Sequence, residues 1–213
     1  MGKPQLTLAE TKEMVLHSCQ RMEESKDLLT QADKAIGDGD HGVGMARGFE
    51  AVRQKVASQE FSALDELVKT VGTALLTSVG GAAGAIFGTL FRGGAMNLGA
   101  RQVFDSAALA VMLSDGLQAV QARGQASPGD KTVVDALQPA AVKAEELSSA
   151  PLDETLGSVT EAARQGMEQT KNMVARIGKA KTLGERSLGH ADPGALSTYL
   201  ILKYFTEYVT ELG

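Results

Sequence analysis

Apolar residues along this chain recur every three or four positions, which is the spacing of amphipathic helices. The stretch from residue 64 to residue 75 is the clearest example. Its apolar side chains fall on one helical face, whereas Asp65, Glu66 and Lys69 fall on the opposite face. Runs that alternate with a period of two are absent from the sequence. The pattern therefore predicts an all-α domain.

The helices are expected to end where glycine, proline and aspartate interrupt this pattern. The interruptions predict about eight helices, at roughly residues 7–32, 42–57, 62–78, 83–99, 105–123, 131–148, 152–175 and 194–211. Short connections between long helices favour antiparallel neighbours. A chain of 213 residues is long enough for one sizeable core, so we expect a single domain over residues 1–213.

The composition argues against several classes of partner. Lys and Arg total 21 against 26 Asp and Glu, a formal charge of −5, so the overall field repels nucleic acid and anionic membranes. The one cysteine, Cys19, follows the helical spacing of Val15 and Met22, which favours a buried thiol over a ligand. There is no apolar segment of a signal peptide, and the longest apolar stretch is too short to span a bilayer. We expect a cytoplasmic protein with no membrane or nucleic-acid partner.

A first unusual stretch, KAIGDGDHGVGMARGF at residues 34–49, is both acidic and rich in glycine. A tight turn needs one capping carboxylate at most, so the surplus indicates a counter-ion. A chain break at Gly37 would let Asp33, Asp38 and Asp40 converge. Hard oxygen ligands of this kind suit Mg²⁺, which takes its remaining ligands from water and phosphate. A solvated acidic turn with a helix cap is the alternative.

Two better-known loops are disfavoured for the same stretch. Residues 37–42 formally match G-x-G-x-x-G, but no strand precedes them and their carboxylates would repel a pyrophosphate. An EF-hand aligned on Asp38 would have Val43 in place of the turn glycine and Phe49 in place of the bidentate glutamate.

A second stretch, TSVGGAAGAIFGTLF at residues 77–91, predicts that two helices meet at Gly80 and Gly81. Small residues there would expose backbone amides at a helix N-terminus, which favours an anion. A Walker A loop is excluded because no Lys-Ser or Lys-Thr follows the glycines. The alternative is a smooth ridge for close helix packing, since Gly80, Gly84 and Gly88 are spaced by four.

A third stretch, KAKTLGERSLGHADPGALS at residues 179–197, concentrates positive charge before a helix start. Its basic side chains are Lys179, Lys181, Arg186 and His190. In an acidic protein such charge could neutralise phosphates or dock an acidic partner, and a solvated loop is the alternative.

The segments IGDGDHGVGM, SVGGAAG, GDKTVVDAL and GERSLGHADPGA occur in this order and together resemble the nucleotide-binding L subunits of dihydroxyacetone kinases. The resemblance runs from about residue 29 to the last helix. It implies an antiparallel barrel of eight amphipathic helices, with ADP or ATP and two Mg²⁺ ions bound at one end.

The resemblance also implies roles for individual residues. Asp33, Asp38 and Asp40 would be the magnesium ligands. The phosphates would lie along His41, Gly42, Val43, Gly44, Ala82 and Ala83, and the nucleoside would be enclosed by Gly124, Val133, Lys179, Asp192, Pro193 and Gly194. No side-chain nucleophile or general base is expected, because phosphoryl transfer needs mainly positioning and charge neutralisation.

Three positions depart from the family pattern. Ala83 stands where some members carry a serine, Val133 replaces a larger methionine, and Lys179 lies where an arginine can occur. Losing one neutral hydrogen bond costs about 0.5–1.5 kcal/mol, so we expect looser nucleotide binding rather than none.

The resemblance further implies partners. Dihydroxyacetone, or a related small ketose or sugar, would be held on a separate K subunit, and a phosphohistidine-carrying M protein of the phosphotransferase system would rephosphorylate the bound ADP. The chain ends at Gly213 without a fused K-like domain, which favours this coenzyme mode. Alternatives are a subunit that exchanges ATP freely, or a nucleotide-sensing module that acts on a transcription regulator without turnover. A purely structural helical scaffold would leave the mutually repelling carboxylates unexplained.

Overall fold

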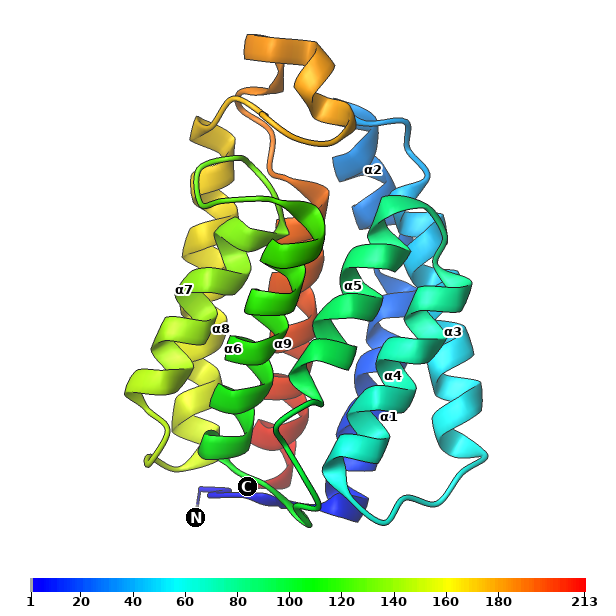
Figure 1. Ribbon diagram of the computed structural model, residues 1–213, viewed down its shortest axis with the longest axis vertical. Helices are drawn as coiled ribbons and strands as arrows, with labels where there is room; N and C mark the ends of the chain where they lie inside the picture. Colours follow the sequence, from blue (N-terminus) through cyan, green and yellow to red (C-terminus); the bar gives the residue numbers. More distant parts are fainter. Residues whose placement is uncertain (1) are drawn as a thin grey trace.

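A computed structural model describes residues 2–213 of the chain. Within these residues nine α-helices run up and down the long axis of the molecule (Figure 1). They are α1 (Leu8–Glu24), α2 (Lys26–Ile36), α3 (His41–Ala57), α4 (Leu64–Ser78), α5 (Gly81–Gly94), α6 (Ser106–Gly124), α7 (Val133–Glu146), α8 (Leu152–Gln169) and α9 (Pro193–Leu212). The predicted all-α fold is confirmed.

Eight of these helices form a closed ring. Contacts join α1 to α3, each helix from α3 to α9 to its successor, and α9 back to α1. The shorter α2 lies at one end of the ring, against α3 and α9. Because neighbours are antiparallel, α3, α5, α7 and α9 all begin at the end where α2 lies (Figure 1).

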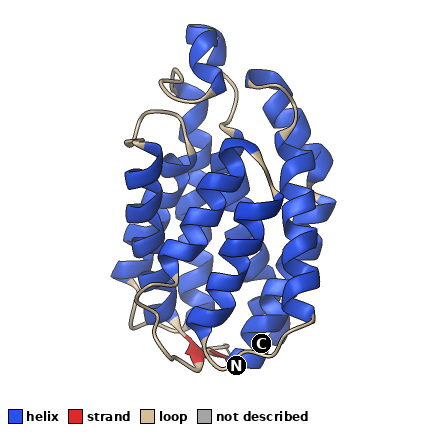
Figure 2. Cartoon of the chain, turned by 45° about the vertical axis from the view of Figure 1, so that its right-hand side comes forward, coloured by secondary structure: helices blue, strands red, loops and turns tan. Residues whose placement is uncertain are grey.

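The two ends of the ring are closed differently. At the end that holds both termini, β1 (Leu6–Thr7) pairs antiparallel with β2 (Val103–Phe104), and Figure 2 shows this small ladder beside the termini. At the other end, between α8 and α9, lie two 3₁₀ segments, η1 (Thr170–Asn172) and η2 (Lys179–Ser187).

The core fills the ring with the apolar faces that the periodicity identified. Leu64, Leu67 and Leu75 of α4 are fully buried. Cys19 is 1% exposed, as expected, and burial raises the pKa of its thiol well above the usual range. The thiol is therefore protonated at neutral pH, which agrees with a packing role. In residues 2–213, no helix has both the length and the hydropathy needed to cross a membrane.

The expected helix boundaries need correction in several places. The predicted helix 7–32 is interrupted at Ser25, where α1 ends and α2 begins. The predicted helix 83–99 begins at Gly81 and ends at Gly94, and the predicted helix 152–175 ends at Gln169. The segment 179–187 forms 3₁₀ turns where a loop is expected, and the strand pair is not anticipated by any period-two pattern.

Candidate nucleotide and metal site

A cavity of about 310 Å³ opens at the end of the ring where α3, α5, α7 and α9 begin. This size lies within the range of small-molecule sites. The sequence-predicted site residues that line the cavity are Asp33, Asp38, Asp40, His41, Gly44, Ala82, Ala83, Gly124, Val133, Lys179, Asp192, Pro193 and Gly194. Residues from both halves of the chain therefore meet at one place.

The four helices that begin at the cavity make its field favourable to anions. The first-turn N–H groups of a helix have no acceptor within the helix, and the helix dipole places partial positive charge at that end. The arrangement is a consequence of the up-and-down ring, which brings every second N-terminus to the same end.

The three predicted carboxylates converge at the edge of this cavity. Asp33, in the last turn of α2, is 9% exposed, whereas Asp38 and Asp40 in the following turn are exposed. One carboxylate oxygen from each lies within 4.8 Å of the other two. Oxygen donors so arranged fit a hard divalent cation such as Mg²⁺. The predicted fold-back of the chain at Gly37 is confirmed.

Local backbone constraints produce this convergence. A Cβ atom at Gly37 would lie 2.1 Å from Asp33 Oδ1, so the close approach requires glycine. Gly39 adopts φ +80°, a left-handed conformation that glycine adopts without strain. Asp33 Oδ2 accepts hydrogen bonds from the N–H groups of Gly39 (2.9 Å) and His41 (3.1 Å). The buried carboxylate thus orders the turn that carries the other two.

Lys179 places a cation among these carboxylates. Its ammonium pairs with Asp38 and lies 3.6 Å from Asp40 Oδ2. The hydrogen bond from Lys179 holds the pKa of Asp38 below its usual range, and Asp38 raises the pKa of Lys179. The sequence analysis expects Lys179 beside the nucleoside, whereas its ammonium lies with the carboxylates of the same cavity.

The turn between α4 and α5 lines the cavity and leads into a helix N-terminus there. Gly80 and Gly81 adopt φ +81° and +57°, and α5 begins at Gly81. Arg47 of α3 fixes the turn from outside, because its Nε donates to Ser78 O (2.7 Å) and its Nη2 donates to Val79 O (2.6 Å). Sequence reasoning missed Arg47, which looks like an ordinary exposed helical arginine.

Close helix packing, the alternative interpretation of the series Gly80, Gly84 and Gly88, applies to Gly88. A Cβ at Gly88 would lie 2.6 Å from Leu76 Cβ, so Gly88 lets α5 approach α4 closely. Gly81, in contrast, has nothing within 4 Å of such a Cβ, and its role comes from its positive φ. Gly88 therefore serves helix packing, whereas Gly81 shapes the turn before α5.

At the start of α3, some residues line the cavity and others pack against α2 or face solvent. His41 lines the cavity, and its Nε2 lies 2.7 Å from Ser197 Oγ of α9. Burial lowers the pKa of His41, opposed by the charges of Asp33 and Asp40, so the ring is neutral at pH 7. Gly42 packs against α2, with a Cβ there only 2.2 Å from Lys26 O, and the Val43 side chain is exposed. Gly42 and Val43 are therefore not among the residues that line the cavity, unlike His41 and Gly44 on either side of them.

Part of the cavity lining is apolar. Ile86, Val120 and Ile177 form this part together with Val133. Such a wall suits a flat, largely apolar group such as a nucleobase. Ile86 and Val120 carry no recognisable sequence signal, because they occupy helix positions that look like ordinary core, and Ile177 lies in a loop. The family resemblance implies only Val133 at this place.

Asp192 brings a titratable group to the cavity wall. It is the N-cap of α9, and its Oδ1 accepts a hydrogen bond from Ala195 N (2.8 Å). Burial raises the pKa of Asp192 to about 7, although the hydrogen bond from Ala195 and the charge of Lys131 oppose this. Lys131 also lines the cavity and is a second residue that the sequence analysis did not select.

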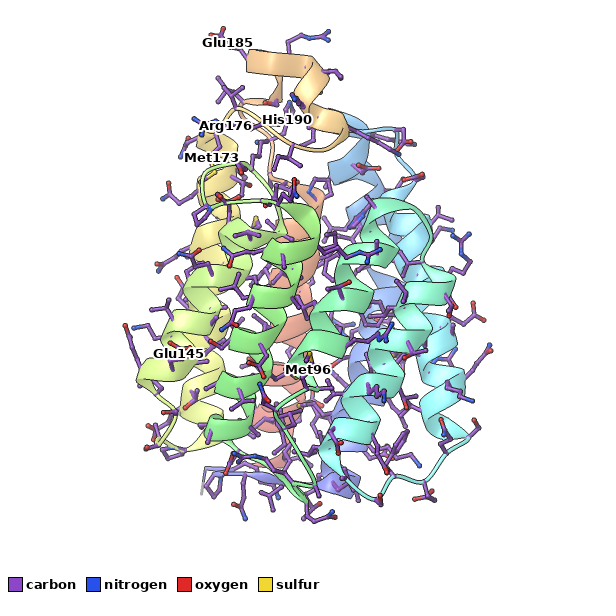
Figure 3. The ribbon with its side chains drawn as sticks, in the orientation of Figure 1. Met96, Glu145, Met173, Arg176, Glu185 and His190 are labelled. Atoms are coloured by element: carbon purple, nitrogen blue, oxygen red, sulfur yellow. The ribbon has the colours of Figure 1, made fainter. Side chains whose placement is uncertain are left out.

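The remaining basic residues of the third stretch lie outside the cavity lining. Lys181 and Arg186 belong to η2, and Figure 3 shows His190 beside it at this end of the ring. His190 faces the site only through its backbone carbonyl, which accepts a hydrogen bond from Lys131.

Comparisons with known proteins agree with this geometry. A family model described as the DAK2 domain matches residues 35–207. The ADP-binding subunit DhaL of the PEP-dependent dihydroxyacetone kinase of Escherichia coli (strain K12) is 40% identical over 182 residues, which are 83% of this chain and 85% of that protein. The corresponding subunit of the PTS-dependent kinase of Lactococcus lactis subsp. lactis (strain IL1403) is 36% identical over 204 residues, or 96% and 99% of the two chains.

A solved structure extends the similarity to three dimensions. The dihydroxyacetone kinase from C. freundii, in complex with AMP-PNP and Mg²⁺, matches with a TM-score of 0.73 and 26% identity. The match covers 97% of this chain and 35% of that one, so the similarity concerns one part of a larger protein.

Proposed function

The chain belongs to the DAK2-domain family, and we propose that it is the ADP-binding subunit of a dihydroxyacetone kinase. It would pass a phosphoryl group from a magnesium-bound nucleotide to dihydroxyacetone or a related small ketose or sugar. One observation carries the proposal: three converging carboxylates lie beside four helix N-termini in a single cavity. The names of the curated relatives, which are ADP-binding subunits of such kinases, support it.

The metal ligands in this proposal are Asp33, Asp38 and Asp40. Their donor set fits Mg²⁺, which prefers oxygen and completes its octahedral shell with water and phosphate oxygens. Bound there, Mg²⁺ would neutralise and orient the phosphates. We propose two ions, as the family resemblance implies, and the ratio of metal to protein in the nucleotide complex tests this number.

The nucleotide itself would be held by backbone N–H groups and by the apolar part of the cavity lining. The first-turn N–H groups of α3 (Gly42 and Val43) and α5 (Gly81–Ala83) would donate to phosphate oxygens. The His41 N–H is already bound to Asp33 Oδ2. The base would pack on the wall that includes Val133, and Pro193 and Gly194 would bound the nucleoside. Lys179 would leave the carboxylates and neutralise phosphate charge when metal takes its place.

The chemical step needs little from the side chains of this chain. The substrate hydroxyl oxygen would bond to the terminal phosphorus while the bond from that phosphorus to the bridging oxygen breaks. ADP would leave with the electrons of that bond, and the hydroxyl proton would pass to solvent or to a base of the K subunit. Positioning and charge neutralisation contribute most to such a reaction. We therefore assign no nucleophile or general base to this chain and leave the binding of the ketose to a separate K subunit.

The proposed phosphoryl donor is an M protein of the phosphotransferase system, which would rephosphorylate ADP in place. The names of the relatives, PEP-dependent and PTS-dependent kinases, support this donor. All three partners would then meet in the cytoplasm.

A second candidate is a subunit that exchanges ATP, or one that senses nucleotide without turnover. Two residues of the cavity lining favour such weaker retention of the nucleotide. Ala83 offers no hydroxyl to phosphate, and Val133 leaves more room beside the base than the larger methionine of the family. Both changes would speed nucleotide release.

The first test is the nucleotide content of the protein purified in magnesium. Stoichiometric ADP that survives gel filtration and leaves with EDTA supports the coenzyme mode, whereas reversible binding of added Mg·ATP supports exchange. Protein that binds neither nucleotide contradicts the site.

A reconstituted assay with K and M proteins then separates a kinase subunit from a sensor. Asp38→Asn and Asp40→Asn should each abolish turnover without loss of helix content. Glu154→Gln, an exposed carboxylate on the first turn of α8 at the other end of the ring, should leave turnover unchanged. Full turnover in both aspartate variants would contradict the metal assignment.

A further inference from the structure

Lys131 is a lysine that the proposed reaction does not use, yet it is only 1% exposed. Lysine is rarely buried to this extent without partners. Its backbone lies in the left-handed region, with φ +62°, in the connection between α6 and α7. A strained backbone and a buried charge at one residue indicate that its position is fixed by a specific need.

The ammonium of Lys131 joins three segments of the chain. Its Nζ donates a hydrogen bond to Thr170 O (2.5 Å), at the end of α8, and another to His190 O, just before α9. Lys131 itself belongs to the α6–α7 connection. Two of these segments reach the cavity directly, because Lys131, Val133 and Asp192 line it.

Neighbouring hydrogen bonds extend this connection to Asp192. The Asp192 N–H donates to Thr170 Oγ1 (2.9 Å), and Thr170 is fully buried. On the other side, Asp135 accepts hydrogen bonds from Gly129 N (2.6 Å) and Thr132 N (2.7 Å), which fixes the turn that carries Lys131. Hydrogen bonds thus connect Lys131 to the segments of Thr170, His190 and Asp192.

We propose that Lys131 is a positioning residue for the nucleotide: its buried ammonium fixes the Thr170 and His190 segments so that Asp192 and the N-terminus of α9 face the cavity. The inference rests on the proposed function. It assigns to Lys131 a role in nucleotide affinity through the residues it holds, without contact with the reacting phosphates.

The charges around Lys131 give this role a pH signature. Asp135 of α7 and Asp192 before α9 face its ammonium, and His190 contributes only a backbone carbonyl. Burial lowers the pKa of Lys131, and the two carboxylates oppose this. In turn the Lys131 charge lowers the pKa of Asp192. A nucleotide brings negative charge, so its affinity should fall as pH rises through the pKa of Asp192.

The experiment is calorimetric titration with Mg·ADP between pH 5.5 and 8.5, on wild type, Lys131→Met and Lys143→Met. Lys143 is a matched control because it lies on α7, about 15 Å along the helix from Val133, and pairs with Glu146 at the surface. Lys131→Met should bind at least tenfold more weakly, and the fall in affinity should shift to higher pH than in wild type. The affinity of Lys143→Met for Mg·ADP should stay within twofold of the wild-type affinity, with an unchanged dependence on pH.

Several outcomes would overturn the inference or separate it from the proposed function. Lys131→Met with wild-type affinity and pH profile overturns it. Wild type that binds no Mg·ADP overturns the proposed function instead. Hydrogen exchange on the ligand-free proteins then still tests the positioning role, since the amide of Asp192 should exchange at least tenfold faster in Lys131→Met than in Lys143→Met, and an equal rate would overturn it.

Thr170→Val is the second variant, because a buried lysine also contributes to folding. It keeps the carbonyl that Lys131 binds and removes only the hydroxyl that holds the Asp192 N–H. A loss of threefold or more in Mg·ADP affinity, with unchanged circular dichroism, is expected. Unchanged affinity in this folded variant would contradict the proposed network.

Discussion

At the scale of single residues, the site depends on steric fit and on contacts between distant segments, which sequence patterns do not reveal. The glycines of the acidic stretch predict a flexible turn, yet their effect is steric: Gly37 leaves room for the carboxylate of Asp33. The convergence of Asp33, Asp38 and Asp40 could be predicted because a short chain segment carries all three. The roles of Arg47 and Lys131 could not be predicted, because each side chain donates hydrogen bonds to backbone carbonyls of distant segments.

Replacing Gly37 by alanine should disrupt the carboxylate cluster. The new Cβ would lie 2.1 Å from Asp33 Oδ1, so the carboxylate or the turn must move. We expect at least a tenfold loss of Mg·ADP affinity in calorimetry, with little loss of helix. Gly157→Ala is the control, because Gly157 lies on the exposed face of α8 and nothing lies within 4 Å of a Cβ there. Alanine at this position should stabilise the fold by about 0.5–1 kcal/mol. Equal nucleotide affinity in the two variants would contradict a steric role for Gly37.

Asp192 should make stability depend on pH. Its pKa is raised to about 7 from an ordinary value of 3.8, so the folded state holds a proton that the unfolded state releases. The resulting stabilisation is fully present below pH 3.8 and is lost as pH rises through about 7. Asp192→Asn keeps a cap for α9 and removes the titration. Urea unfolding from pH 4 to pH 8 should show wild type losing stability relative to this variant, by at most about 1.4 kcal/mol per pH unit. Parallel curves would exclude Asp192 as the titrating group.

At the scale of helices, periodicity predicted most elements because each ring helix buries one face. Most predicted ends lie within about two residues of the observed ones. The break between α1 and α2 was missed because Ser25 is neither glycine nor proline. Its hydroxyl hydrogen-bonds Arg21 O (2.8 Å) and the hydroxyl of Tyr204 on α9 (2.6 Å). Since one partner comes from the last helix of the chain, no local pattern could reveal this break.

The Ser25 break should therefore be stabilised by Tyr204. Ser25→Ala leaves the buried hydroxyl of Tyr204 without this partner, which should cost about 1–3 kcal/mol of unfolding free energy. Tyr204→Phe should cost a similar amount, and the double variant should cost clearly less than the sum. Urea denaturation of all four proteins gives the coupling. Additive losses would mean that the two hydroxyls do not depend on each other.

At the scale of the whole molecule, ring closure creates the site. The contact between α9 and α1 brings the last helix beside the first, so that Asp192 and Lys179 share a cavity with Asp33 and Asp38. Sequence motifs could place these residues in one site through resemblance. They could not identify Ile86 and Val120 as part of its apolar lining, because a lining residue and a core residue of an amphipathic helix follow the same period. Ile177 lies in a loop, where no period applies.

Because the cavity joins distant parts of the ring, a ligand there should stabilise the entire fold. A ligand that binds only the folded state adds about 2.7 kcal/mol at one hundred times its Kd. We expect Mg·ADP to raise the thermal midpoint by several degrees, and ADP with EDTA to raise it little, because the carboxylates then repel the phosphates. Differential scanning fluorimetry measures both shifts, with Asp38→Asn expected to respond weakly and Glu154→Gln to respond like wild type. An equal shift with and without EDTA would mean that the nucleotide binds through the helix N-termini alone. The metal would then contribute nothing to the binding of the nucleotide.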